Sequence, residues 1–99
     1  MIRYSFIILD GYYIMQKSQI ISEIEAIVKS TTSEKYSIWT IGVTDNTSDR
    51  KSQHGDPKHW KQWATDSERD GRDIEEYFLD KKMKGGTGGP GTADYVYIF

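Results

Sequence analysis

The chain has 99 residues, of which 36% are hydrophobic and 13% aromatic, enough for the core of one domain but not of two. Thirteen lysines and arginines against fifteen acidic residues give a net charge of -2, which excludes a surface that is basic throughout and a polybasic membrane anchor. The absence of cysteine excludes disulfides and thiolate zinc sites, and the longest apolar run, Phe6 to Leu9, is too short to span a bilayer. We therefore expect a cytoplasmic protein with no membrane partner, in which any nucleic-acid contact comes from a local patch.

The N-terminal region predicts a strand followed by an amphipathic helix. Residues 3–9 are rich in aromatic and β-branched side chains and end at Asp10-Gly11, which is a turn signal. Because Met15 is a second candidate start, we divide the chain into an N-terminal strand or extension, 1–14, and a single domain, 15–99. Residues 16–30 predict a helix, since apolar side chains spaced three and four apart share one of its faces: Ile20, Ile21, Ile24, Ile27 and Val28.

The middle of the chain predicts a strand, a tight turn and a short helix. β-Branched and aromatic residues dominate 36–44, and Gly42 inside this strand indicates a bulge or the close approach of another backbone or a ligand. Residues 45–47 supply the turn and a candidate N-cap, so a short helix is expected over 48–54, ended by Gly55.

The C-terminal half predicts a second helix and a terminal strand. Thr65 and Glu68 have the spacing of a capping box, so a helix is expected over 66–83, with a buried stripe formed by Ile74, Phe78 and Tyr77. A glycine-rich loop, 85–91, precedes a strand over 94–99, in which Tyr95, Tyr97 and Phe99 share one face and Val96 and Ile98 the other. Together these elements predict an α+β fold with a small central mixed or antiparallel sheet flanked by helices.

The segment around Gly42 resembles the GIY-YIG nuclease superfamily. Thr40-Ile41-Gly42-Val43-Thr44 stands where the family has Tyr-Ile-Gly-x-Thr, Arg50 follows the glycine by eight residues, and His54 follows the arginine by four, as in the family. The later segment 74–78, Ile-Glu-Glu-Tyr-Phe, looks like the family's glutamate-bearing helix, with Glu75 as the first choice and Glu76 as the second. The resemblance covers residues 39–83.

The resemblance implies phosphodiester hydrolysis with one divalent metal, Mg²⁺ or Mn²⁺, held by Glu75. It places Arg50 near the scissile phosphate and a tyrosine near the attacking water, and it adds His54 and Thr40 to the candidate catalytic residues. These roles are physically reasonable, because a phosphoryl transition state gathers negative charge that a guanidinium and a carboxylate-bound metal stabilise. A phenol or an imidazole can take a proton from the water.

Two features depart from the family pattern. Thr40 stands in place of the signature tyrosine, and the strand that should carry the Gly-Ile-Tyr element before it is missing. The candidates for a substitute are Gly11-Tyr12-Tyr13-Ile14 and the terminal strand with Tyr95 and Tyr97. We favour the terminal strand, because a strand lost from one end of a small sheet can be replaced by one from the other end; Tyr97 would then supply the missing phenol.

A local basic and aromatic patch follows Gly42. Residues 50–63 carry four lysines and arginines against one acid, Asp56. A patch this small predicts weak binding of nucleic acid with a shallow salt dependence. Its candidate DNA or RNA contacts are Lys51, Lys58, His59, Trp60 and Lys61.

The nuclease interpretation has three alternatives: ordinary structural roles for these residues, and two other function classes. His54 would then interact with the carbonyls at the end of its helix, and Glu75 would belong to a solvated charged face. In the second function class, a catalytically inactive relative binds nucleic acid or protein through the surface of Arg50, His54 and Trp60. In the third, the terminal strand pairs with the same strand of a second copy and forms a homodimer.

Overall fold

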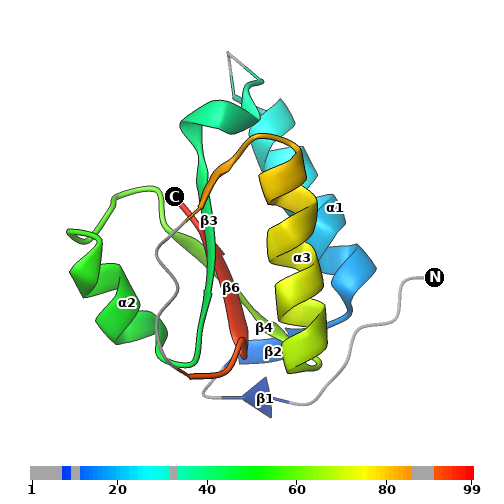
Figure 1. Cartoon of the computed structure of the whole chain (residues 1–99), viewed down its shortest axis with the longest axis vertical. Coiled ribbons are helices and arrows are strands. Elements are labelled where there is room, and N and C mark those ends of the chain that lie inside the picture. The colour runs from blue at the N-terminus through cyan, green and yellow to red at the C-terminus, as the bar shows by residue number, and fades with distance from the viewer. Residues whose placement is uncertain (1–7, 10–11, 32–33, 86–90) are drawn as a thin grey trace.

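A computed structural model describes residues 8–9, 12–31, 34–85 and 91–99, and within these ranges the chain forms three α-helices and one six-stranded sheet (Figure 1). The helices are α1 (Lys17–Lys29), α2 (Thr47–Gln53) and α3 (Glu68–Asp80). The strands are β1 (Ile8–Leu9), β2 (Tyr12–Met15), β3 (Thr40–Thr44), β4 (Lys61–Thr65), β5 (Lys84–Gly85) and β6 (Tyr95–Ile98), and a single 3₁₀ turn covers Tyr36–Ile38. The predicted α+β class is confirmed.

The sheet is mixed, and its strands lie in the order β1-β2-β4-β6-β3-β5. The pairs β2–β4 and β3–β5 are parallel, whereas β1–β2, β4–β6 and β3–β6 are antiparallel. The C-terminal strand β6 therefore lies between β4 and β3, and both of its edges are already hydrogen-bonded. The expectation that this strand offers a free edge to a second copy is wrong.

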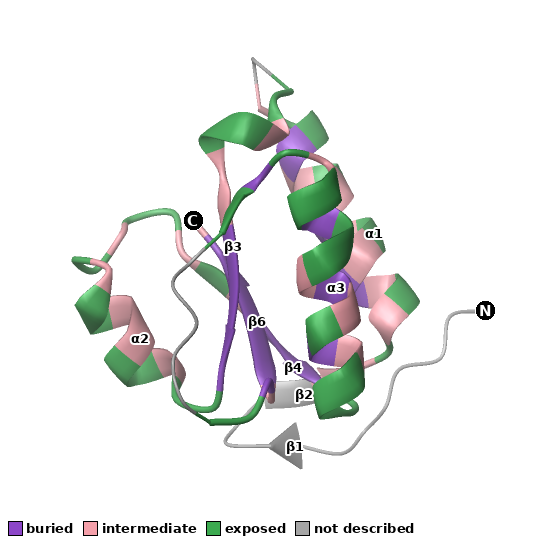
Figure 2. Ribbon diagram, viewed as in Figure 1, coloured by how far each residue is buried: buried purple, intermediate pink, exposed green. Residues whose placement is uncertain are grey.

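One face of the sheet is covered by α1 and α3, which lie next to each other (Figure 1). Their apolar stripes meet the inward side chains of β3, β4 and β6 in one core, which appears as the buried centre of the molecule in Figure 2. The fully buried members of this core are Ile20, Ile24, Val28, Ile41, Ile74, Phe78, Ala93, Val96 and Ile98. The predicted helical face of α1 is confirmed, because three-residue and four-residue spacings bring its isoleucines to the sheet.

Two details of α3 correct the sequence interpretation. The helix is capped by Ser67, whose hydroxyl accepts a hydrogen bond from the Asp70 backbone N–H, and not by Thr65. Thr65 is unavailable because it belongs to β4, and its buried hydroxyl lies 3.0 Å from the Ala93 carbonyl oxygen. Tyr77 is 37% exposed and is no part of the buried stripe, since its hydroxyl turns toward α1 and donates to Glu25.

The other elements differ from expectation mainly in their bounds. α2 begins at Thr47, capped by the Asn46 side chain, which accepts from the Asp49 backbone N–H; it ends before Gly55, which has a φ of +82°. Residues 61–65 form the strand β4, which the sequence did not predict. The boundary expected between residues 14 and 15 falls inside β2, which pairs with β4 through Ile14 and Met15.

Some expectations fall outside the described residues. The predicted strand 3–9 can be compared only at Ile8–Leu9, and most of the predicted glycine loop, 86–90, is not described. No helix in the described ranges is both long enough and apolar enough to cross a membrane.

Candidate functional site

The candidate site lies on the face of the sheet opposite α1 and α3. In the sheet register Tyr97 pairs with Gly42 on one side and with Gln62 on the other, so these three residues share one face, which we call the α2 face. The neighbouring register pairs, such as Val43 with Val96, point to the apolar core instead. Tyr97 is 1% exposed although it lies outside that core.

Gly42 is required because the Tyr97 side chain crosses β3 at this point. A Cβ atom at position 42 would overlap the ring carbon and the hydroxyl of Tyr97. The sequence predicted a bulge or the close approach of a backbone or a ligand at Gly42, and the group that approaches is instead the Tyr97 phenol. The terminal strand is therefore the antiparallel neighbour of the Thr40–Thr44 strand, as the favoured substitute for the missing element requires. The other candidate, in β2, is separated from β3 by β4 and β6.

His54 contacts the hydroxyl of Tyr97. Its Nε2 lies 3.1 Å from the Tyr97 Oη, and the two ring centroids are 5.6 Å apart. The contact arises because His54 is the C-cap of α2, one helical turn after Arg50, and the chain turns away at Gly55. The sequence assigned His54 and Tyr97 to one site, and the structure brings them into hydrogen-bond distance.

An aromatic stack covers Tyr97 from outside. The Trp60 indole lies 4.4 Å from the Tyr97 ring at 11° and 5.7 Å from the Phe99 ring at 12°, measured between centroids. His54 also packs on Phe99 at 4.8 Å. Trp60 was predicted as a contact for nucleic acid, and the structure adds a packing role, because one side of its ring is occupied by the site itself.

The charges of Arg50 and Glu75 both act on Tyr97, and that of Arg50 also acts on His54. Burial raises the pKa of Tyr97, the positive charge of Arg50 lowers it in part, and the negative charge of Glu75 raises it further. Burial lowers the pKa of His54, and Arg50 lowers it again. At neutral pH, Tyr97 is consequently protonated and His54 is uncharged.

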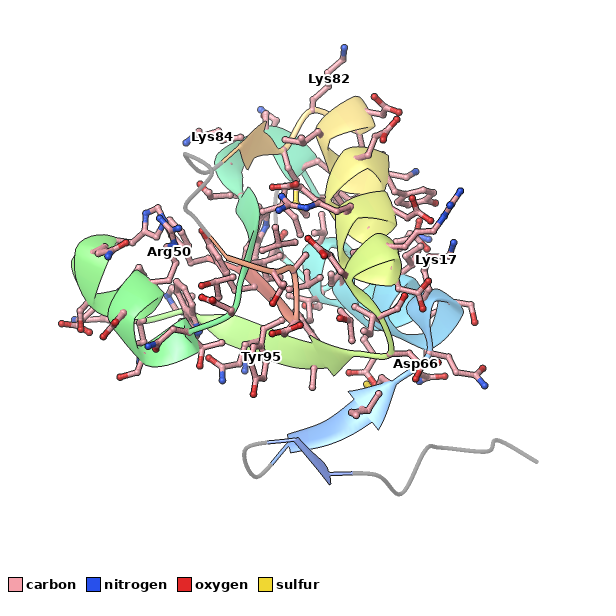
Figure 3. All side chains as sticks on the ribbon, turned by 60° about the horizontal axis from the view of Figure 1, so that its bottom comes forward. Lys17, Arg50, Asp66, Lys82, Lys84 and Tyr95 are labelled. Atoms are coloured by element: carbon pink, nitrogen blue, oxygen red, sulfur yellow. The ribbon has the colours of Figure 1, made fainter. Side chains whose placement is uncertain are left out.

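Arg50 reaches the site from α2. Figure 3 shows it on the side of the molecule away from Lys17 and Asp66. It also lines a cavity of about 150 Å³, which is bounded by Thr44, Asp45, Asn46, Asp49, Arg50 and Gln53. A guanidinium at this position provides planar donors for phosphate oxygens.

Glu75 lies on α3, and its negative charge acts on Tyr97. Its side chain is 19% exposed, its carboxylate lies 3.9 Å from the Arg72 guanidinium, and burial raises its pKa, an effect that Arg72 opposes. Gly71, one turn earlier, lets α3 approach the chain before β6 closely, since a Cβ there would overlap Ala93. Glu76 is exposed, so Glu75 is the better candidate of the two.

The metal would depend on this one carboxylate. No group of three or more His, Cys, Asp or Glu side chains in the described ranges is placed to hold a metal ion. A half-buried carboxylate with a raised pKa nevertheless fits a hard divalent cation, because Mg²⁺ commonly takes one or two carboxylates and completes its shell with water and phosphate oxygens.

The remaining predicted residues lie around this centre. Thr40 begins β3 on the α2 face, and its backbone exchanges hydrogen bonds of 2.8 and 3.1 Å with Phe99. Lys58, His59 and Lys61 are exposed in the loop after α2 and at the start of β4. Gln62 was missed, because only the pairing of β4 with β6 places it beside Tyr97.

No protein family model matches the sequence, and neither a curated protein nor a solved structure matches it. The functional interpretation therefore depends on the residues of the site.

Proposed function

We propose that the protein is a GIY-YIG-like, metal-dependent nuclease that hydrolyses phosphodiester bonds of DNA or RNA at the α2 face. The observation that carries the proposal is the buried Tyr97 hydroxyl, which lies 3.1 Å from His54 Nε2 while the charges of Arg50 and Glu75 both act on it. A proton-transfer pair, a cation for phosphate and a carboxylate for a metal are the groups that this hydrolysis needs.

The Tyr97–His54 pair would take the proton of the attacking water. In the tautomer with the proton on Nδ1, the Tyr97 hydroxyl donates to His54 Nε2. As the water oxygen bonds to phosphorus, the bond to the leaving oxygen breaks and that oxygen takes a proton from the solvent. The water proton passes to Tyr97 Oη and the phenol proton passes to His54. The lowered pKa of His54 supports this role, because the imidazole is unprotonated at neutral pH.

Arg50 and Glu75 would act on the phosphate. The Arg50 guanidinium donates to the non-bridging oxygens, whose negative charge grows in the transition state. Glu75 would hold Mg²⁺ or Mn²⁺, which supplies Lewis-acid stabilisation of that charge when bound.

The test is cleavage of labelled DNA and RNA in Mg²⁺ or Mn²⁺ by the wild type and three variants. We expect Tyr97→Phe, Arg50→Ala and Glu75→Gln each to lose about 10²-fold or more in rate, the range for groups that act in proton transfer or charge stabilisation. Matched controls are Tyr95→Phe on the same strand and Glu76→Gln beside Glu75, and both should cleave at nearly the wild-type rate.

Two outcomes would overturn the proposal. Cleavage that survives in Tyr97→Phe and Glu75→Gln would show that another site is responsible. Binding of nucleic acid that needs Arg50, without cleavage by the wild type in either metal, would instead establish the catalytically inactive binding protein.

A further inference from the structure

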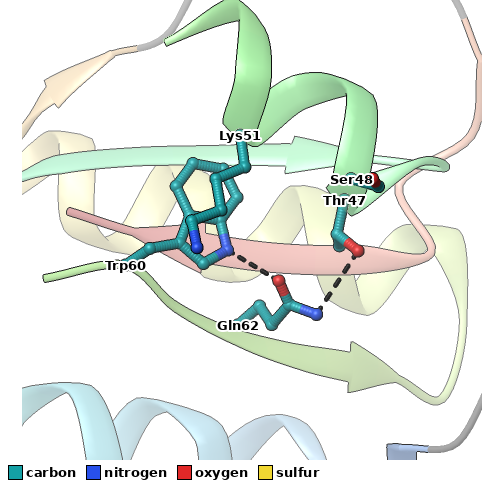
Figure 4. A pocket seen from close by; sticks show the side chains of 5 residues that line it. All are labelled: Thr47, Ser48, Lys51, Trp60 and Gln62. Carbon is teal, nitrogen blue, oxygen red and sulfur yellow. Dashed lines mark hydrogen bonds between the residues drawn. The ribbon is translucent and has the colours of Figure 1, made fainter. Parts of the chain in front are cut away.

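A second cavity lies beside the proposed reaction site, against another side of α2. It has a volume of about 390 Å³ and is lined by Thr47, Ser48 and Lys51 of α2, by Trp60, and by Gln62 of β4 (Figure 4). This volume is within the usual range of small-ligand pockets, about 300–1,000 Å³. None of these five residues takes part in the proton transfer or the metal binding proposed above.

Gln62 is held in one orientation at the edge of this cavity. The Trp60 Nε1–H donates to Gln62 Oε1 at 2.6 Å, and Gln62 Nε2 donates to Thr47 Oγ1 at 3.3 Å (Figure 4). These two bonds fix which end of the amide is the donor and which is the acceptor. One N–H and one oxygen lone pair of the amide are left for a ligand.

Tyr97 and Phe99 cover one face of the Trp60 ring and leave the other face uncovered by either of them. The Tyr97 and Phe99 ring centroids are 6.2 Å apart, and both rings are nearly parallel to the indole. Two rings that stack on opposite faces of one indole each lie about 3.5 Å from its plane. Their centroids would therefore be about 7 Å apart or more. Both rings therefore lie on the same side of Trp60, and Trp60 is only half-buried.

The helix α2 places a cation next to this ring and joins the cavity to the reaction site. Thr47 and Lys51 are one turn apart and line the cavity, whereas Arg50 and His54, also one turn apart, lie near Tyr97. Arg50 and Lys51 are adjacent in the chain, so Arg50 and the cavity lie on neighbouring sides of α2.

We propose that this cavity is a subsite for one unpaired nucleotide of the strand that is cleaved, a proposal that rests on the proposed function. The base stacks on Trp60, its edge bonds to the Gln62 amide, and Lys51 neutralises a phosphate. The base must be unpaired, because in a continuous duplex both of its faces are stacked and its pairing edge is occupied. The substrate is then a single-stranded or frayed nucleic acid, and stacking adds to an electrostatic patch that is weak alone.

The test measures binding separately from cleavage. Fluorescein-labelled oligothymidylate of eight nucleotides and a blunt duplex are titrated in EDTA, with fluorescence anisotropy as the readout. Ser48→Trp fills the cavity from an exposed position, and Lys51→Ala removes its cation. We expect each variant to bind the single strand about 10-fold or more weakly, the effect of losing one stacked base or its phosphate contact.

The matched controls are Ser52→Trp, one turn further along α2 and exposed, and Lys29→Ala, an exposed lysine in the last turn of α1. Both should bind within about 2-fold of the wild type, because neither lines the cavity. Among the indole N–H signals in a ¹H–¹⁵N spectrum, the signal of Trp60 should shift on adding the oligonucleotide and that of Trp39 should not.

The outcomes separate this proposal from the nuclease activity. Single-strand binding that Ser48→Trp abolishes supports the subsite even if no substrate is cleaved. Unchanged binding and cleavage in Ser48→Trp and Lys51→Ala would overturn the subsite and leave the nuclease standing. Equal affinity for the duplex and the single strand would also overturn it.

Discussion

The two faces of the sheet are built from different chemistry. The face under α1 and α3 is closed by aliphatic and aromatic side chains, among them Ile24, Ile74 and Phe78, which are fully buried. On the α2 face, Tyr97 is equally buried, but its hydroxyl bonds to His54 and its ring lies beneath Trp60.

The difference indicates on which face a substitution should mainly change stability and on which it should mainly change function. The first face is held mainly by apolar packing, and large changes there should unfold the protein. The α2 face buries a phenol and an imidazole, which stabilise a fold less than apolar groups of similar size unless each is hydrogen-bonded. Three variants can break or sharpen this comparison.

The largest effect is expected from Phe78→Ala on the α1–α3 face. The ring is fully buried and stacks at 6.0 Å on Tyr36, so its removal leaves a cavity and should lower the free energy of unfolding by about 3–5 kcal/mol. Denaturant titration followed by circular dichroism measures the loss. The control is Leu79→Ala at the next position, 38% exposed, which should change it by less than about 1 kcal/mol. Equal effects of the two variants would show that this face is not the main core.

A smaller effect is expected from Gly42→Ala on the α2 face. The added methyl group would overlap the Tyr97 ring and hydroxyl, so the ring must shift, and overpacking of this kind lowers stability by about 1–3 kcal/mol. The near-ultraviolet circular dichroism of the aromatic stack should change at the same time.

The matched control for Gly42→Ala is Gly85→Ala in β5, on the other side of β3. Its Cβ would lie 3.2 Å from the Leu79 Cδ2, the far end of a flexible side chain, so a change within about 0.5 kcal/mol is expected. If Gly42→Ala were as harmless as this control, Tyr97 would not lie across Gly42 in solution.

The same contrast explains how much the sequence could predict. The buried stripe of α1 follows from helical periodicity, and the helix after Gly42 follows from the Asn46 cap and Gly55, so these elements were expected nearly as they are. Both signals are local.

The missed features depend on tertiary pairing. The strand β4 has no alternation of apolar and polar residues that distinguishes it. Thr65 looked like a helix cap because two of the carbonyls that its hydroxyl meets, those of Ala93 and Asp94, are more than twenty residues away. Within the candidate site, Tyr97 was a reasonable hypothesis because the terminal strand could replace the strand missing from the family pattern. The Trp60–Gln62–Thr47 chain of hydrogen bonds could not be predicted, since it joins three separate segments.

The smallest effect is a pH dependence of the free energy of unfolding, which we expect from His54. Burial and Arg50 lower the pKa of His54 below its ordinary value of 6.5. The unfolded chain therefore binds a proton at this residue more readily than the folded chain does. Its contribution to stability is present above about pH 6.5 and is lost as the pH falls through the lower pKa of the folded state.

We expect the wild type to lose stability relative to His54→Gln when the pH is lowered from about 7.5 to 5.5. The difference between the two proteins removes the contribution of Glu75, whose raised pKa acts in the opposite direction because its protonation favours the folded state. Parallel curves for the wild type and His54→Gln would mean that His54 is as hydrated in the folded protein as in the unfolded chain, and the neutral imidazole proposed to accept the proton of Tyr97 would lose its physical basis.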